Sequence, residues 1–144
     1  MMNKLVKPAV YDYSARRKVI DSICAEYEFI KRSVIGRSCG GRDIYALKIG
    51  SAAEYSLIAA AFHGSEHITS VVLLMFIEEL ADAVKSGGYL CGLNAARALG
   101  DRGVIFIPCV NPDGCEISIN GINACGELGS TVKRLCLGDF EHWN

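Results

Sequence analysis

The sequence predicts an α/β protein with a mixed, mostly parallel sheet and helices on both faces. Two apolar runs, at 56–62 and 104–110, are typical of buried strands, because strands covered by helices on both sides lose the apolar–polar alternation. Residues 68–85 lie between these runs and repeat apolar side chains at helical spacing. A strand–helix–strand order of this kind places the two strands parallel in one sheet.

The chain before the first apolar run predicts a helix and a hairpin. Residues 13–29 have helical periodicity, and Ser14 is the expected N-cap because its hydroxyl can accept a hydrogen bond from the first turn. Strands are expected at 34–38 and 43–49. The Gly-Gly pair at 40–41 indicates a hairpin turn, since glycine accepts positive φ without steric cost.

The middle of the chain is dominated by the helix expected at 68–85. Its apolar content is dense enough to predict burial on much of its circumference, and the glycine pair at 87–88 marks its end. Residues 93–99 predict a further short helix.

The second apolar run leads into Asn-Pro-Asp-Gly at 111–114. This order fits a type I turn, in which Asn stands first, Pro second and Gly fourth. A short strand is expected at 116–119, and residues 120–144 are Gly-rich and predict irregular structure.

Composition narrows the possible functions. The chain has 144 residues, of which 51% are hydrophobic, enough for one packed domain or a large part of one. Its net charge is −1 and no charge block stands out, so we expect neither nucleic acid nor a membrane as a partner. The longest apolar stretch, 71–77, is too short to span a bilayer. Residues 1–11 contain no apolar segment typical of a secretory signal, and a cytoplasmic protein is expected.

The cysteines predict reduced thiols rather than a disulfide scaffold. Their number is odd and no Cys-x-x-Cys occurs, so a thiolate zinc site lacks its usual spacing. We expect them to pack as small apolar groups, with Cys115 and Cys125 flanking a surface hairpin. The seven are Cys24, Cys39, Cys91, Cys109, Cys115, Cys125 and Cys136.

The first apolar run ends in His63-Gly64-Ser65-Glu66, a candidate zinc site. Open α/β sheets place ligands at the carboxyl ends of their strands, and Zn²⁺ accepts imidazole nitrogen and carboxylate oxygen. A purely structural interpretation also exists, in which Glu66 stabilises the dipole of the following helix. A third interpretation uses His67: His-x-x-Glu-His is the inverzincin pattern, which requires both histidines on one continuous helix.

Three segments in order resemble the N-terminal half of the M14 zinc carboxypeptidases (carboxypeptidase A-like). They are Gly-Arg-x-x-x-Gly-Arg-Asp-Ile-Tyr-Ala-Leu-Lys-Ile-Gly at 36–50, the strand ending in His63-Gly64-Ser65-Glu66, and the strand running into 110–114. Among them, the bacterial enzymes that act on cell-wall peptides are the most similar in character. The combination is more specific than His-x-x-Glu alone.

The resemblance implies that His63 and Glu66 are the first two ligands of one Zn²⁺ ion. In the family a later histidine is the third ligand, and a glutamate and arginines further along complete the machinery that cleaves a peptide at its C-terminal end. None of these later residues has a position in this sequence. We therefore expect residues 1–144 to form the N-terminal part of one metallocarboxypeptidase-like catalytic domain, truncated, weak in zinc binding and inactive alone.

Two further hypotheses concern what such a chain does. One is a non-catalytic binding or assembly module that keeps half the fold. The other is self-association, because a shortened sheet exposes edges and apolar faces at 56–62 and 104–110. Remaining polar candidates are assigned ordinary roles: Asn111 and Asp113 to the turn, and His67, His142, Arg37, Arg42, Arg97, Arg102 and Arg134 to the surface.

Overall fold

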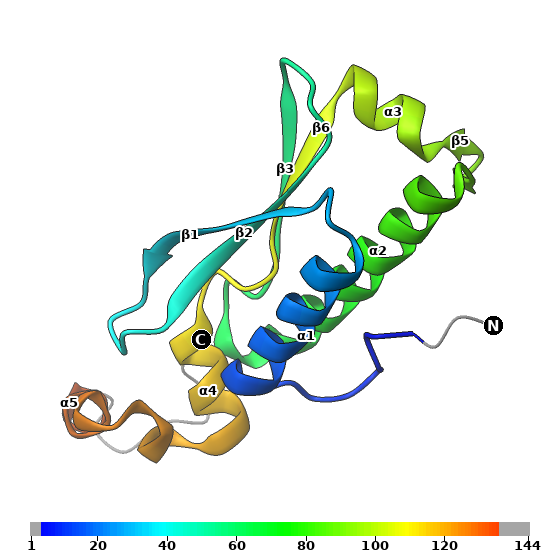
Figure 1. The fold of residues 1–144 in the computed structure, drawn as a ribbon. Helices are drawn as coiled ribbons and strands as arrows, with labels where there is room; N and C mark the ends of the chain where they lie inside the picture. The colour runs from blue at the N-terminus through cyan, green and yellow to red at the C-terminus, as the bar shows by residue number, and fades with distance from the viewer. Residues whose placement is uncertain (1–3, 136–144) are drawn as a thin grey trace.

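The computed structural model describes residues 4–135, in which helices pack against a four-stranded sheet (Figure 1). In chain order the elements are α1 (Tyr13–Glu26), β1 (Lys31–Arg37), β2 (Asp43–Ile49), β3 (Tyr55–Ala59), η1 (Gly64–Glu66), α2 (His67–Ser86), β4 (Tyr89–Leu90), β5 (Leu93–Asn94), α3 (Ala95–Asp101), β6 (Gly103–Ile107), α4 (Pro112–Asn120), η2 (Ile122–Cys125) and α5 (Glu127–Leu135).

The sheet has the order β1-β2-β6-β3 and is mixed. β1 pairs antiparallel with β2, β2 pairs antiparallel with β6, and β6 pairs parallel with β3. The predicted mixed α/β class is confirmed, including the antiparallel hairpin followed by a parallel crossover through α2. Within the described sheet, antiparallel pairs outnumber the parallel one, because the hairpin supplies two of the four strands.

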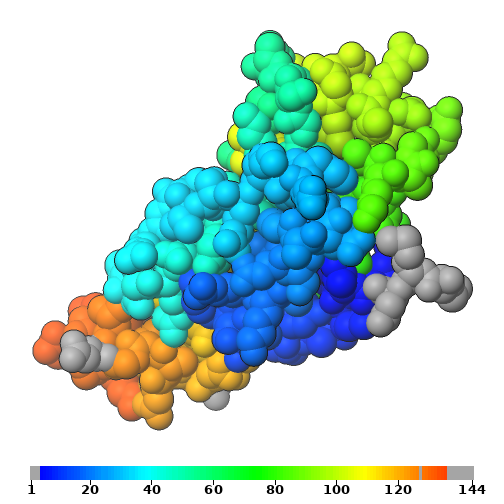
Figure 2. Space-filling model, in the orientation of Figure 1, coloured from blue at the N-terminus to red at the C-terminus, as the bar shows by residue number. Residues whose placement is uncertain are grey.

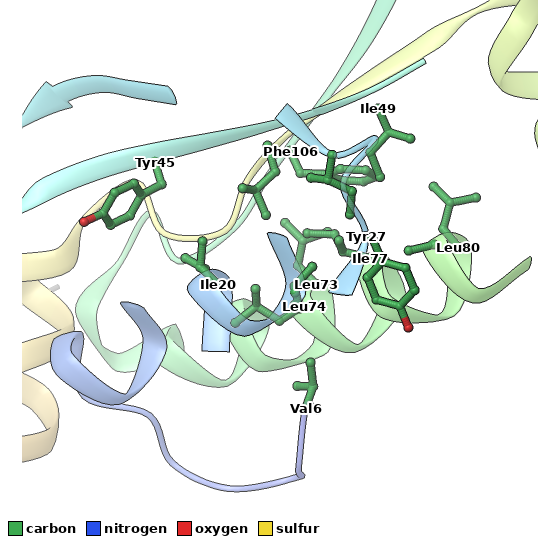
Figure 3. Close-up of a cluster of buried hydrophobic side chains, with 14 of the residues drawn as sticks. Val6, Ile20, Tyr27, Tyr45, Ile49, Leu73, Leu74, Ile77, Leu80 and Phe106 are labelled. Carbon is green, nitrogen blue, oxygen red and sulfur yellow. The ribbon is translucent and has the colours of Figure 1, made fainter. Parts of the chain in front are cut away.

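The main hydrophobic core lies on one face of this sheet (Figure 3). Ile20 of α1 and Leu74 and Ile77 of α2 pack there against Leu47 of β2 and Phe106 of β6. Figure 1 shows α1 and α2 on the same side of the strands. The described residues therefore build one helical layer, and the second layer expected on the opposite face is not formed by them.

β3 differs from its prediction as a strand buried on both faces. Leu57 is 64% exposed and Ile58 40% exposed. The reason is its position: β3 is an edge strand of the described sheet, paired with β6 alone. The apolar composition of residues 56–62 predicts a strand, but composition does not show whether a second strand or helix covers it.

α2 also exposes more apolar surface than predicted. Its bounds, His67–Ser86, closely match the predicted helix, and Gly87 ends it in the left-handed conformation (φ 67°). Leu74 and Ile77 are fully buried, whereas Ile68 and Val72 are 53% and 60% exposed. One stripe of the helix thus faces the core, and another lies open beside β3.

At the N-terminus, Asp12 rather than Ser14 caps α1. The Asp12 side chain accepts a hydrogen bond from the Ala15 N–H at 2.7 Å, and the helix ends at Glu26 instead of at residue 29. Asp and Ser are both favourable N-cap residues, so the local sequence does not show which of the two caps the helix. The predicted hairpin between β1 and β2 is confirmed, with Gly41 at φ 77° in its turn.

After β6, the predicted type I turn and the short strand at 116–119 are both wrong. Asn111 is the N-cap of α4, and its side chain accepts a hydrogen bond from the Gly114 N–H at 2.9 Å. Pro112 occupies the first helical turn, where its missing N–H costs nothing. Cys115 therefore lies buried within α4 and Cys125 within η2, not beside a surface hairpin.

The molecule is elongated in the space-filling view (Figure 2). Residues 112–135 form one end, and residues 89–102 together with the segment leading into β3 form the other. None of the helices within 4–135 is long and apolar enough to cross a membrane.

Candidate metal centre

The candidate centre lies where β3 ends, in a loop that is hydrogen-bonded to the segment following β6. The Ala60 N–H donates to the Ile107 carbonyl, the Val110 N–H to the Ala60 carbonyl, and the Asn111 N–H to the Ala61 carbonyl, each at 3.0 Å. These bonds continue the parallel β3–β6 pairing beyond the strands. The loop that carries His63 is thus fixed at the carboxyl edge of the sheet, where α/β proteins place their ligand sites.

A strained residue turns the chain out of β3. Ala61 has φ 53°, a conformation that a residue with a Cβ adopts at some cost, and its side chain is buried. Its N–H donates to Thr69 Oγ1 at 2.9 Å, and that hydroxyl donates to the Glu66 carbonyl at 2.8 Å. The first turn of α2 therefore holds the strained loop in place.

Gly64 brings this loop into close contact with α4. A Cβ at Gly64 would lie 2.3 Å from the carbonyl oxygen of Gly114, so only glycine fits here. The Asn111 side-chain amide donates to the Phe62 carbonyl at 3.2 Å from the same side. The Asn-Pro-Asp-Gly segment therefore packs against the loop and holds it in place. This role of Asn111 is structural, as predicted, although its contact lies outside the turn.

His63 and Glu66 point toward each other at this edge. His63 Nδ1 lies 3.0 Å from Glu66 Oε1, and both side chains are about half exposed, at 55% and 50%. Two donors bound to one tetrahedral Zn²⁺ at ~2.0–2.1 Å are separated by about 3.3 Å. The pair thus has the donor types and nearly the spacing that a shared zinc ion requires.

The rest of a zinc site is not found within residues 4–135. No group of three or more His, Cys, Asp or Glu side chains there could hold a metal ion. His67 Nδ1 is buried and makes no hydrogen bond to a described residue. His142 lies outside the described residues. The described part of the chain therefore offers two candidate ligands, His63 and Glu66, and no third beside them.

The inverzincin interpretation fails on backbone geometry. His63 is extended (φ −101°, ψ 144°), a short 3₁₀ turn follows, and α2 begins at His67. Two histidines four residues apart share a helix face only when the helix is continuous between them. His63 and His67 therefore do not form the predicted helical pair.

Asp113 has a structural role, but its contacts differ from the prediction: they join α4 to the β1–β2 hairpin turn instead of closing the turn at 111–114. Its carboxylate accepts hydrogen bonds from the Gly40 N–H at 2.7 Å, the Ser38 hydroxyl at 2.8 Å and the Arg42 guanidinium at 2.7 Å. Burial raises its pKa, but the Gly40, Arg42 and Ser38 contacts outweigh burial and hold the pKa below its usual value. Arg42 is thus an ion-pair partner of α4 rather than an ordinary surface arginine. No sequence signal links residues so far apart.

Comparison with known proteins identifies the family. The sequence pattern of the zinc carboxypeptidases (peptidase family M14) matches residues 17–136. The chain is 32% identical over 128 residues to the uncharacterized protein YqgT of Bacillus subtilis, covering 88% of this chain and 34% of that protein. It is 29% identical over 111 residues to γ-D-glutamyl-L-diamino acid endopeptidase 1 of Lysinibacillus sphaericus, covering 77% of this chain and 28% of that enzyme.

A solved structure agrees with the fold. Bovine thrombin-activatable fibrinolysis inhibitor, in complex with a tick carboxypeptidase inhibitor, matches with a TM-score of 0.64 at 18% identity, over 77% of this chain and 34% of that chain. The chain spans about a third of the length of the relatives it matches. The match over residues 17–136, the mixed α/β fold and the strand-end His63–Glu66 pair lead to one conclusion: the chain belongs to the zinc carboxypeptidase family M14.

Proposed function

We propose that this chain contributes His63 and Glu66 as two ligands of a zinc peptidase centre that hydrolyses a peptide or isopeptide bond. The observation that carries the proposal is the 3.0 Å approach of His63 Nδ1 to Glu66 Oε1 at the carboxyl edge of a family M14 sheet. A bound zinc ion would polarise the scissile carbonyl and acidify a water molecule.

The chain's own residues prepare this pair in two ways. The Asn111 amide donates to the Phe62 carbonyl and the Thr69 hydroxyl accepts from the Ala61 N–H, and these two bonds hold the loop that carries His63 and Glu66. Because both side chains are half-exposed, a metal held by them would stay accessible to substrate and to further ligands. A catalytic zinc site uses three protein ligands, so the third ligand and the general base belong to residues outside 4–135.

For the substrate we propose a peptide with a γ-D-glutamyl–diamino acid bond, as found in bacterial cell walls. The support is the similarity to an endopeptidase named for that bond, at 29% identity. The chain covers 28% of that enzyme.

The alternative is a non-catalytic module that binds without hydrolysis. The observation that favours it is the two-ligand centre, since two ligands leave a zinc ion largely to solvent. Both proposals predict weak, at most stoichiometric zinc binding by the chain alone. They differ when the chain is joined to the part of a relative that it does not cover: the peptidase gains hydrolysis, and the module does not.

The test is zinc binding by the purified chain, measured by competition with a chromogenic chelator, for the wild type and for His63→Ala, Glu66→Ala and His67→Ala. Loss of a hydrogen-bond partner of a metal ligand alone costs about 10–100-fold in metal affinity, so we expect His63→Ala and Glu66→Ala to weaken binding by at least about tenfold. His67→Ala is the matched control, since it removes a nearby imidazole, and we expect it to leave affinity unchanged.

Two results would contradict the proposal. Weakening by His67→Ala equal to that by His63→Ala would show that His67 also binds the metal. Unchanged affinity in both His63→Ala and Glu66→Ala would show that any zinc bound by the chain lies elsewhere.

A further inference from the structure

Cys109 and Cys115 form a buried thiol pair that the zinc chemistry does not use. Their sulfur atoms lie 3.7 Å apart, and the side chains are 7% and 0% exposed. Cys109 follows β6, and Cys115 lies in the first turns of α4. A disulfide requires about 2.05 Å between the sulfur atoms, so the pair is one small movement from bonding distance.

A buried arginine lies against this pair. Arg16 of α1 is 3% exposed, and its Nε and Nη1 make no hydrogen bond to any described residue. A guanidinium is always charged, and a buried charge is costly unless a counter-charge accompanies it. A thiolate at Cys115 would supply that counter-charge, because a thiol ionises more readily than a hydroxyl.

The protonation of the pair follows from these contacts. The hydrogen bond from Cys109 lowers the pKa of Cys115, burial opposes this, and the charge of Arg16 reinforces it, so that the net pKa is below its ordinary value. The same hydrogen bond and burial raise the pKa of Cys109. Cys115 is the nucleophilic sulfur, and Cys109 is the thiol beside it.

Cys109 also connects the pair to the surface. It lines a narrow cleft together with Tyr13, Arg16, Asp43 and Pro112. The cleft reaches Cys109, and the sulfur of the fully buried Cys115 lies 3.7 Å from the Cys109 sulfur.

We propose that Cys109 and Cys115 form a redox-active dithiol that hydroperoxides convert to an intramolecular disulfide. The Cys115 thiolate attacks one peroxide oxygen, an S–O bond forms, the O–O bond breaks and hydroxide leaves, giving a sulfenic acid. Cys109 then attacks that sulfur, the S–S bond forms, the S–O bond breaks, and the departing hydroxide takes the Cys109 proton as water. Two sulfurs are oxidised by one electron each, and the peroxide is reduced to one hydroxide and one water. The proton that Cys115 released to solvent on ionising balances the hydroxide, which gives two waters overall.

The disulfide would enclose the segment that holds the loop at 60–66, which carries His63 and Glu66 and is here called the candidate metal loop. Residues 110 and 111 donate hydrogen bonds to the carbonyls of Ala60 and Ala61, and both lie between the two cysteines. The proposal itself does not depend on zinc, and it can be tested in the metal-free chain.

The test treats the chain with a small excess of hydrogen peroxide, blocks the remaining thiols and maps the peptides without reduction. Endoproteinase Asp-N cleaves before Asp113 and Glu-C after Glu116, so Cys109, Cys115 and Cys125 fall in separate peptides. We expect the Cys109 and Cys115 peptides to be joined by a bond that dithiothreitol cleaves. Cys125 should carry the blocking group.

Variants identify the role of each sulfur. In Cys109→Ser the sulfenic acid has no partner, so dimedone present while the oxidised chain is unfolded should label Cys115. In Cys115→Ser both labelling at this site and the cross-link should be absent. Cys91→Ser, which removes an exposed thiol, is the control and should retain the cross-link. Circular dichroism of each variant separates loss of the disulfide from loss of the fold.

The proposal is overturned if peroxide oxidises exposed Cys39 and Cys91 while Cys109 and Cys115 remain blockable after unfolding. It is also overturned if Cys109 is found joined to Cys125 instead.

Discussion

At the residue scale, Gly64 shows how closely the candidate metal loop is packed against α4. Its backbone approaches Gly114 so nearly that a methyl group would overlap the carbonyl oxygen and its carbon, at 2.3 and 2.4 Å. Backbone atoms on both sides cannot rotate away as a side chain could. The His63–Glu66 pair therefore depends on a glycine that takes no part in binding.

We expect Gly64→Ala to destabilise the protein by at least about 1–3 kcal/mol, the usual cost of forcing extra atoms into a packed site. Thermal unfolding followed by circular dichroism measures the effect, and zinc affinity should fall with it because the loop must move. Gly100→Ala is the matched control: nothing lies within 4 Å of the added methyl, and Gly100 lies in α3.

In that control the change should be neutral or stabilising by up to about 1 kcal/mol, since alanine favours helix over glycine. Equal melting temperatures for Gly64→Ala and the wild type would show that the loop and α4 are not in contact.

At the element scale, Asp113 joins the β1–β2 hairpin to α4. Ser38, Gly40 and Arg42 of the hairpin turn all donate to its carboxylate, while Arg42 also donates to the Ala124 carbonyl at 2.6 Å. Glu116 ties the other side of α4 to the start of α1 by accepting from the Tyr13 N–H. Two carboxylates in one helix thus position the segment that supports the metal loop.

The Asp113 contacts predict a loss of stability in acid. Because its folded pKa is below the usual value, its contribution is fully present above the unfolded pKa of about 3.9 and is lost as pH falls through the folded pKa. We expect Asp113→Asn to lower the free energy of unfolding at pH 7 by about 1.5–3 kcal/mol, as for hydrogen bonds to a charged group.

The difference between the wild type and Asp113→Asn should shrink below pH 4 in urea titrations at several pH values. Glu54→Gln is the control, because Glu54 is 70% exposed in its ion pair with Arg102 and such pairs contribute little. A pH-independent difference for Asp113→Asn would mean that its charge is not what joins the elements.

At the scale of the whole molecule, the two edges of the described sheet differ in protection. β1 carries Lys31, Arg32 and Arg37 and a register shift between Val34 and Gly36, features that discourage pairing with another strand. β3 reads Tyr-Ser-Leu-Ile-Ala, without a charge or a proline. Beside it, Val72 and Phe76 of α2 and Ile58 line an open apolar groove of about 450 Å³.

We propose that a second copy of the chain covers the β3 edge when the chain is alone, and we predict concentration-dependent dimers. Light scattering after size exclusion should give a mass above 15.6 kDa that Leu57→Lys returns to the monomer value. Val34→Lys on β1, where Val34 is 51% exposed, is the control and should leave the dimer intact.

A monomer at all concentrations would contradict this proposal. Dissociation by Val34→Lys but not by Leu57→Lys would assign the contact to β1 instead.

Local signals predicted most of the elements. The hairpin, α2, α3 and the two parallel strands were expected from periodicity and glycine positions, which reflect hydrogen bonding and burial over a few residues. The errors lie where local chemistry is ambiguous. Asn-Pro-x-Gly satisfies both a turn and a helix N-terminus, and only burial of Cys115 and Glu116 in the next turn selects the helix.

The candidate site, like the fold, was predicted from the sequence only in part. His63 and Glu66 were identified from their place after an apolar strand, and their roles as ligands remain a prediction. Asp113–Arg42 and Cys109–Cys115–Arg16 were not foreseen, because no periodicity records a contact between α1 and α4 or between a hairpin turn and a helix.

By itself, the sequence determined the α/β class, the family resemblance and the two candidate ligands, because those depend on residue type and spacing along the chain. The tertiary structure alone decided which strand lies at an edge, which thiols are in contact and which helix packs against the candidate metal loop. These depend on contacts between residues up to 103 positions apart, as between Tyr13 and Glu116, and such contacts form only when the elements pack.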